Sequence, residues 1–175
     1  MVENEINTDS LMATIKDSIR KKQWHSADNK IYDYLKYVPN DPDALMYLGV
    51  SKAAQGYEPE GEHHILASLT FNPRNMLAYY HLGVIVLEQG RCILASEAFQ
   101  RGLSIGPENQ ALLYQLGRAL ERLGKYEEAI DAYQQSINSQ LDKELTEEDF
   151  SERSQEAIKR LQDPKIRTDA ETCKE

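Results

Sequence analysis

The sequence is poor in cysteine, and we expect it to be a protein without an export signal. Its 175 residues include only two cysteines, Cys92 and Cys173. Two cysteines cannot build the disulfide framework of a small secreted protein, so we expect a reducing compartment, the cytoplasm. The N-terminus, MVENEINTDS, is polar and acidic. It lacks the basic and apolar regions that an export signal requires.

Basic residues and long hydrophobic runs are also scarce. Lys and Arg total 20 against 29 Asp and Glu, which gives a net charge of −9. A protein that binds the phosphate backbone of a nucleic acid needs a basic stripe, so we expect no nucleic-acid partner. The apolar run at residues 76–87, MLAYYHLGVIVL, is twelve residues long. A helix that spans a bilayer needs about 20 apolar residues, so we expect no membrane insertion.

What the sequence does contain is an internal period of 34 residues. Four series of residues keep this step: Leu48-Gly49, Leu82-Gly83 and Leu116-Gly117; Gly56, Gly90 and Gly124; Pro39, Pro73 and Pro107; Asn7, Asp41, Asn75 and Asn109. Several series that share one period indicate tandem structural repeats. The repeats begin at Thr8, Pro42, Met76 and Gln110.

Each series predicts one part of a helix-turn-helix unit. The short polar residues precede apolar-periodic runs and can cap the first helix of each unit, and the prolines stop the preceding helix. The glycines at Gly56, Gly90 and Gly124 can end the first helix with a positive φ. The glycines of the Leu-Gly pairs lie inside that helix, where glycine costs about 1 kcal/mol against alanine, which indicates a close helix crossing. We expect the facing residues to be the small ones at the matching place in each second helix: Ala27, Gly61, Ala95 and Ala129.

On these residues the chain resembles the tetratricopeptide-repeat family. The family's signature places in the third and fourth units hold Leu82-Gly83, Gly90, Ala95, Phe99 and Pro107, then Leu116-Gly117, Gly124, Tyr126, Ala129 and Tyr133. The resemblance covers roughly residues 8–140, although Ile15 replaces the glycine of the first unit. It implies an all-α fold, a right-handed α-solenoid of four repeats at 8–41, 42–75, 76–109 and 110–140.

The ends of the array predict a cap and polar extensions. A terminal repeat needs a polar cap. Within a linker and cap at residues 141–163, we expect a helix at 147–162 with Thr146 as its N-cap. Its buried face would carry Phe150, Ala157, Ile158 and Leu161. We expect residues 1–7 to be flexible and the tail at 164–175 to be disordered.

The residue types that carry chemistry do not form a pattern typical of a site. His63 and His64 are adjacent, so on a helix they point in different directions and cannot chelate one ion together. Cys92 stands where other repeats carry aromatic residues that pack at the turn, and Cys173 lacks a nearby base. We therefore predict no metal, no cofactor and no catalysis.

The resemblance implies that the first helices of the repeats line a concave groove. We expect its floor and ends to consist of Lys16, Met46, Tyr47, Val50, Leu77, Tyr80, His81, Val84, Tyr114 and Arg118. Aromatic residues at the places of Tyr80 and Tyr114 are ordinary in the family. Val50, Leu77 and Val84, however, stand where polar residues are expected. An exposed apolar cluster of this kind commonly marks a binding surface.

One family subtype grips the C-terminal carboxylate of chaperones with Lys, Arg and Asn side chains. Neither repeat register supplies this clamp; aligned from the second unit, the places hold Met46, Val50, His81, Ala111 and Gln115. We therefore predict a non-catalytic adaptor, scaffold or chaperone-like module that binds an apolar peptide or helix of a partner protein. A self-associating subunit of a homo-oligomer and an unrecognised enzyme are the alternatives.

Overall fold

The computed structural model describes residues 7–139 and 149–163, and these residues form an all-α protein. Within those two ranges there are nine helices and no strand. The predictions for residues 1–6, for Thr146 and the linker, and for the tail beyond residue 163 lie outside the described residues. The helices belong to two compact units, unit 1 (Met1–Pro73) and unit 2 (Arg74–Glu175).

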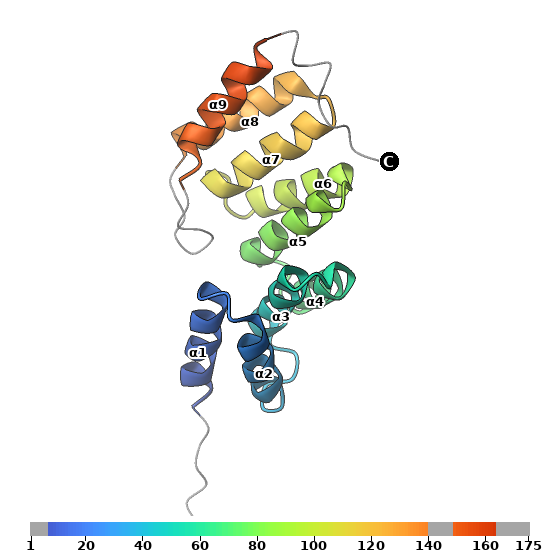
Figure 1. The fold of residues 1–175 in the computed structure, drawn as a ribbon, viewed down its shortest axis with the longest axis vertical. Helices are drawn as coiled ribbons and strands as arrows, with labels where there is room; N and C mark the ends of the chain where they lie inside the picture. The colour runs from blue at the N-terminus through green and yellow to red at the C-terminus, as the bar shows by residue number, and fades with distance from the viewer. Residues whose placement is uncertain (1–6, 140–148, 164–175) are drawn as a thin grey trace, which may run out of the picture. The chain divides into compact units, whose positions relative to one another are not determined.

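Unit 1 consists of two helix pairs (Figure 1). The first pair is α1 (Thr8–Arg20) with α2 (Trp24–Leu35), and the second is α3 (Pro42–Ala54) with α4 (Glu58–Phe71). Helix α2 packs on α3 and joins the two pairs. The core between α1, α2 and α3 includes Ile15, Ile31 and Leu48, all of which are buried.

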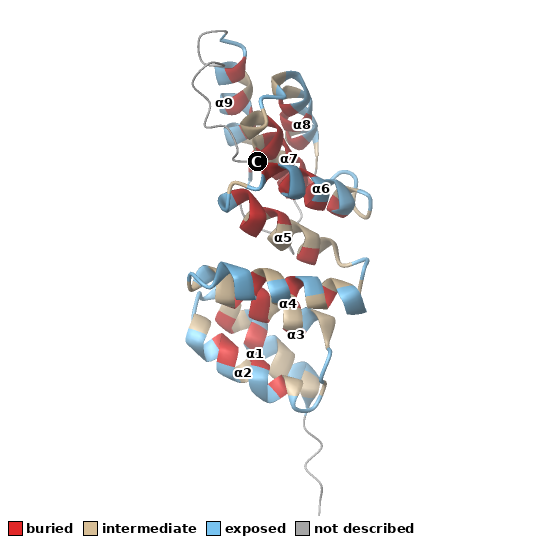
Figure 2. Ribbon diagram, turned by 90° about the vertical axis from the view of Figure 1, so that its right-hand side faces the viewer, coloured by how far each residue is buried: buried red, intermediate tan, exposed pale blue. Residues whose placement is uncertain are grey.

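Unit 2 consists of two further pairs and a last single helix. The pairs are α5 (Met76–Glu88) with α6 (Cys92–Leu103), and α7 (Gln110–Arg122) with α8 (Tyr126–Asn138). Helix α9 (Ser151–Leu161) packs on α8. Helix α7 contacts α5, α6 and α8, and Figure 2 shows it as buried along most of its length. We call the first helix of each pair (α1, α3, α5, α7) the A helix and the second the B helix.

The A helices begin where the period predicts, because a short polar side chain caps each of them. Asp41 Oδ1 accepts a hydrogen bond from the Ala44 N–H at 2.8 Å, and Asn75 Oδ1 accepts one from the Ala78 N–H at 3.0 Å. The other two caps, Asn7 and Asn109, make the same contact with the residue three places on. The predicted N-caps are therefore confirmed.

The turns between the A and B helices need a positive φ. Gly56, Gly90 and Gly124 adopt φ values of +86°, +79° and +74°. In the first repeat the equivalent residue is Lys22, which has a φ of 56°. An L-residue in this left-handed region is strained by about 1–2 kcal/mol, because its Cβ crowds the following carbonyl. The first repeat therefore has the same left-handed turn, but with a lysine in place of the glycine that adopts this φ without strain.

The glycines inside the A helices do not all have the predicted neighbour. A Cβ on Gly49 would lie 2.7 Å from the Gly61 carbonyl oxygen, so the α3 and α4 backbones approach closely, as expected. A Cβ on Gly83 would instead meet the Phe99 ring at 2.3 Å, and one on Gly117 would meet the Tyr133 ring at 2.6 Å. Ala95 and Ala129 are thus not the nearest neighbours. In unit 2 the glycine of each A helix leaves space for an aromatic ring of the B helix, so the distance between the two helices depends on the volume of that ring.

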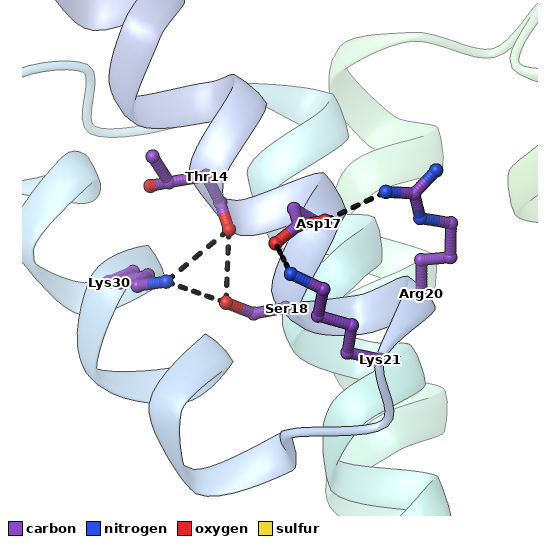
Figure 3. A network of polar contacts seen from close by, with 6 residues as sticks. All are labelled: Thr14, Asp17, Ser18, Arg20, Lys21 and Lys30. Carbon is purple, nitrogen blue, oxygen red and sulfur yellow. Dashed lines mark hydrogen bonds and ion pairs between the residues drawn. The ribbon is translucent and has the colours of Figure 1, made fainter.

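The first pair has no such glycine and uses a polar contact between α1 and α2. Ile15 occupies the glycine place and is fully buried in the core of unit 1. Lys30 Nζ of α2 donates to Ser18 Oγ at 2.7 Å and to the Thr14 carbonyl at 3.5 Å (Figure 3). On the outer side of α1, Asp17 pairs with Arg20 and Lys21 (Figure 3).

The capping helix was expected to begin at residue 147, but it begins later in the chain. Helix α9 begins at Ser151, and Phe150 precedes it rather than lying on its buried face. Phe150 is the N-cap and makes no side-chain cap hydrogen bond, while Asp149 Oδ1 accepts from the Ser151 N–H at 2.8 Å. Ala157 and Leu161 of α9 are buried in the core of unit 2, as predicted for a cap.

Replacing Lys22 by glycine should stabilise unit 1. We expect Lys22→Gly to raise the free energy of unfolding by about 0.5–1 kcal/mol, because the relief of strain exceeds the added entropy of the unfolded chain. The matched control is Lys21→Gly, one residue earlier, where φ is −80° and glycine offers no relief. Chemical denaturation followed by circular dichroism measures both variants. A loss of stability in Lys22→Gly equal to that in the control would contradict the prediction.

Candidate functional site

The ten residues predicted to line a groove divide between the two units. Lys16, Met46, Tyr47 and Val50 belong to unit 1, and the remaining six belong to unit 2. Each unit therefore has its own A-helix surface, on α1 and α3 in unit 1 and on α5 and α7 in unit 2.

In unit 1 the predicted residues differ in how accessible they are. Lys16 is exposed on α1, and Val50 is half-buried on α3. Tyr47 is partly buried and packs against the core that contains Ile15. Met46 was expected on an open groove floor but is only 1% exposed, so its side chain is not accessible to a partner protein.

In unit 2 the predicted apolar residues are half-buried against their own chain. Tyr80, Val84 and Tyr114 pack against the main core of the unit. Leu77, Tyr80 and Tyr114 also pack against a smaller cluster, formed by buried Ala111 and Phe150. We call Ala111 and Phe150, with Met76, Leu77, Tyr80 and Tyr114 around them, the Phe150 cluster.

Phe150 covers part of the A-helix surface of unit 2. Its side chain comes from the residue before α9 and is 2% exposed. Its ring stacks on that of Tyr114, with ring centroids 4.5 Å apart and an interplanar angle of 15°. The C-terminal element thus has two roles, because α9 caps α8 while Phe150 reaches the face formed by α5 and α7.

A buried glutamine holds the backbone around Phe150. Gln110, the first residue of α7, is 3% exposed. Its Nε2 donates to Asp149 Oδ1 at 3.2 Å and to Ser151 Oγ at 3.0 Å. Its Oε1 accepts from the Phe150 N–H at 3.3 Å. One amide side chain therefore satisfies polar groups of three consecutive residues, which fixes the position of the aromatic ring between them.

The cation predicted at one end of the surface is paired. Arg118 Nη1 donates to Gln115 Oε1 at 2.8 Å, and Arg118 Nη2 lies 3.1 Å from Glu88 Oε1. Because the guanidinium already contacts two side chains of its own protein, it is less available to bind a carboxylate of another protein.

His81 adds no positive charge to the surface at neutral pH. Burial of the imidazole lowers the pKa of His81 to about 4, because removal from water penalises the charged form. Its ring lies edge-on to Tyr80, with centroids 5.2 Å apart. The predicted surface residue is thus a neutral, aromatic neighbour of Tyr80.

Other candidate groups are accounted for by packing. Burial, and then the nearby His63 and Lys52 charges, lower the pKa of His64. Cys92 is 1% exposed in the core of unit 2, so its side chain is part of the packing. Among the residues that the structure describes, no three or more His, Cys, Asp or Glu side chains gather to hold a metal. In the same residues, no helix combines the length and the apolar character needed to cross a membrane.

Two residues of this surface were missed or misplaced by the sequence analysis. Gln110 was given no role, and Phe150 was assigned to the buried face of the capping helix. An acidic and an aromatic residue directly before the α9 start, Asp149 and Phe150, were the available signal. That signal does not say which helix the ring contacts, because the contact joins segments distant in the chain.

The comparison with known families identifies one of the repeats directly. Residues 110–140, which span α7 and α8, match the family model of the tetratricopeptide repeat. The chain therefore contains a tetratricopeptide repeat at residues 110–140. A search of curated proteins finds no match.

Solved structures share the tetratricopeptide-repeat fold over nearly the whole chain. A crystal structure of MamA protein is 21% identical with a TM-score of 0.71, over 93% of this chain and 85% of that chain. MamA from residue 41 to its end, from Desulfovibrio magneticus RS-1, is 17% identical with a TM-score of 0.67, over 94% and 97% of the two chains. A MamA structure labelled MSR-1 is 18% identical with a TM-score of 0.71, over 95% and 91%. At these identities the likeness concerns the fold alone.

The imidazole of His81 should titrate far below the ordinary range of a histidine. We expect a midpoint near pH 4, whereas an ordinary histidine titrates near 6.5. The folded state then binds fewer protons than the unfolded state, so this histidine lowers stability as the pH falls from about 6.5 towards 4. NMR titration of the imidazole resonances measures the midpoint. A His81 midpoint near 6.5 would show that the ring is solvated.

Proposed function

We propose that the protein is a non-catalytic interaction module, an adaptor, scaffold or chaperone-like protein. It binds an apolar peptide or helix of a partner protein on its A-helix surface. We place the main binding site on unit 2, on the face of α5 and α7 that carries Leu77, Tyr80, Val84 and Tyr114. The tetratricopeptide fold supports the general class, and the side chains on this face support the chemistry of the partner.

The observation that carries the proposal is the apolar character of α5. Val84 and Leu77 occupy places that are expected to be polar in the family, and both are half-buried rather than fully enclosed in the core. Full burial of such a side chain contributes roughly 1.5–3 kcal/mol. Two or three of them can anchor a partner after the ordering costs of association are subtracted.

The residues at the clamp places of this face do not supply the cations that would hold the C-terminal carboxylate of a chaperone. His81 is neutral at physiological pH, since burial lowers its pKa to about 4. Arg118 is paired with Gln115 and Glu88. Of the clamp places, Ala111 is 1% exposed and Gln115 is 6% exposed, and neither carries a charge. We therefore continue to expect no carboxylate-clamp binding of chaperone termini.

A charge on the A-helix surface should abolish capture of the partner. We expect Val84→Glu to reduce the captured amount about tenfold or more, because binding would have to desolvate the carboxylate. The matched control is Ile93→Glu, which adds the same charge to α6 at an apolar side chain that is 53% exposed. Affinity capture from cell extract with quantitative mass spectrometry compares wild type with both variants, after circular dichroism has verified their folding. Equal capture by wild type and Val84→Glu would exclude this face as the binding site.

Self-association is the alternative use of the same face. Multi-angle light scattering across a range of concentrations separates the two. A strict monomer excludes the self-associating subunit, whereas a dimer that Val84→Glu dissociates would identify a second copy as the partner.

A further inference from the structure

The A-helix surface of unit 2 already carries a ligand-like segment of the same chain. Residues 149–151, Asp-Phe-Ser, lie against α7 through a stacked ring and a set of hydrogen bonds. Phe150 and Ala111 form the cluster against which Leu77, Tyr80 and Tyr114 pack, and the proposed function assigns these three residues to partner binding.

The contacts define what this surface recognises. Tyr114 stacks on an aromatic ring at a centroid distance of 4.5 Å. Gln110 offers an amide donor to a carboxylate oxygen before that ring and to a hydroxyl after it, and an amide acceptor to the backbone N–H between them. Hydrogen bonds from the Ser151 backbone and hydroxyl lower the pKa of Asp149, so this acid is ionised at neutral pH. The surface thus fits an extended segment in which an acidic residue precedes an aromatic one.

The attachment of α9 to α8 does not depend on Phe150 alone. Ser154 Oγ donates to Ser136 Oγ at 3.3 Å, and Arg160 pairs with Glu121 of α7. Leu161 is 2% exposed in the core of unit 2. The helix therefore has its own contacts, so residues 149–151 can be exchanged for another segment without removing the cap.

We infer that the A-helix surface of unit 2 is a recognition site for an acidic-aromatic segment, and that residues 149–151 occupy it as an internal ligand. A partner protein binds by presenting the same chemistry, an Asp or Glu followed by a Phe or Tyr, and displaces Phe150 from Tyr114. This inference rests on the proposed function and names the partner class for that same surface. Internal occupation lowers the apparent affinity of the partner, because only the fraction of molecules with an open site can bind.

A peptide that copies the internal ligand tests the inference. The probe is a fluorescein-labelled synthetic peptide, EEDFSERS, which has the sequence of residues 147–154. Fluorescence anisotropy measures its binding to the full chain. We expect the Phe150→Ala protein to bind it about tenfold or more tightly than wild type, since the competing ring is gone. A peptide with alanine in place of the phenylalanine should bind this variant about tenfold or more weakly.

The controls separate this effect from loss of structure. Phe71→Ala makes the same change at a side chain of unit 1 that is 52% exposed, and it should bind the peptide as wild type does. Circular dichroism checks the fold of Phe150→Ala. If that variant is unfolded, Phe150→Leu replaces it, since leucine keeps an apolar side chain and loses the stacking on Tyr114. The expected direction is the same.

Two results would overturn the inference. One is equal binding of the peptide by wild type and by the folded Phe150 variant; the other is equal binding of the Phe and Ala peptides. Either of them, together with a loss of partner capture in Val84→Glu, would leave the proposed function standing. A different result is also informative: the peptide binds tightly and needs its phenylalanine, but Val84→Glu captures as much partner as wild type. That result would contradict the proposed role of Val84 in partner binding and would support the recognition site at Tyr114 and Gln110.

Discussion

The facing side chains between the two helices of each pair are the constraint on which the rest of the structure depends. In unit 2 a glycine of the A helix lies under an aromatic ring of the B helix, Gly83 under Phe99 and Gly117 under Tyr133. In unit 1, Gly49 lies against Ile65 and the α4 backbone. Because protein interiors are close-packed, these contacts determine how near the helices approach. They thereby determine where the opposite face of each A helix is presented.

The apolar run at residues 76–87 illustrates the consequence. Val86 and Leu87 of α5 are buried in the main core of unit 2, and Leu82 and Val84 pack against it. Leu77 and Tyr80 pack against the cluster of Ala111 and Phe150, and Phe150 is the residue before α9. A helix that is apolar on nearly every face is therefore stable in a repeat protein, because the neighbouring pair and the C-terminal element cover different faces of it.

Much of the fold could be predicted because its signals are local. The N-caps act on a backbone N–H three residues away, and the turn glycines act on their own φ. These signals correctly predicted the starts of the A helices and the helix-turn-helix repeats. The candidate site was harder, because the periodic pattern says which face a residue occupies but not what covers it. Met46 proved buried, and Phe150 proved to lie outside the helix to which it was assigned.

The sequence by itself determined the repeat period, the helix starts and the all-α class, because capping and backbone preferences involve neighbouring residues only. The tertiary structure alone decided that aromatic rings rather than alanines lie over Gly83 and Gly117, since that choice depends on side-chain volumes on facing helices. It also decided that Gln110 and Tyr114 hold residues 149–151, and the contact between Gln110 and Phe150 joins residues 40 positions apart in the chain. The contact of residues 149–151 with α7 is not part of the 34-residue repeat, so the periodic pattern does not predict it.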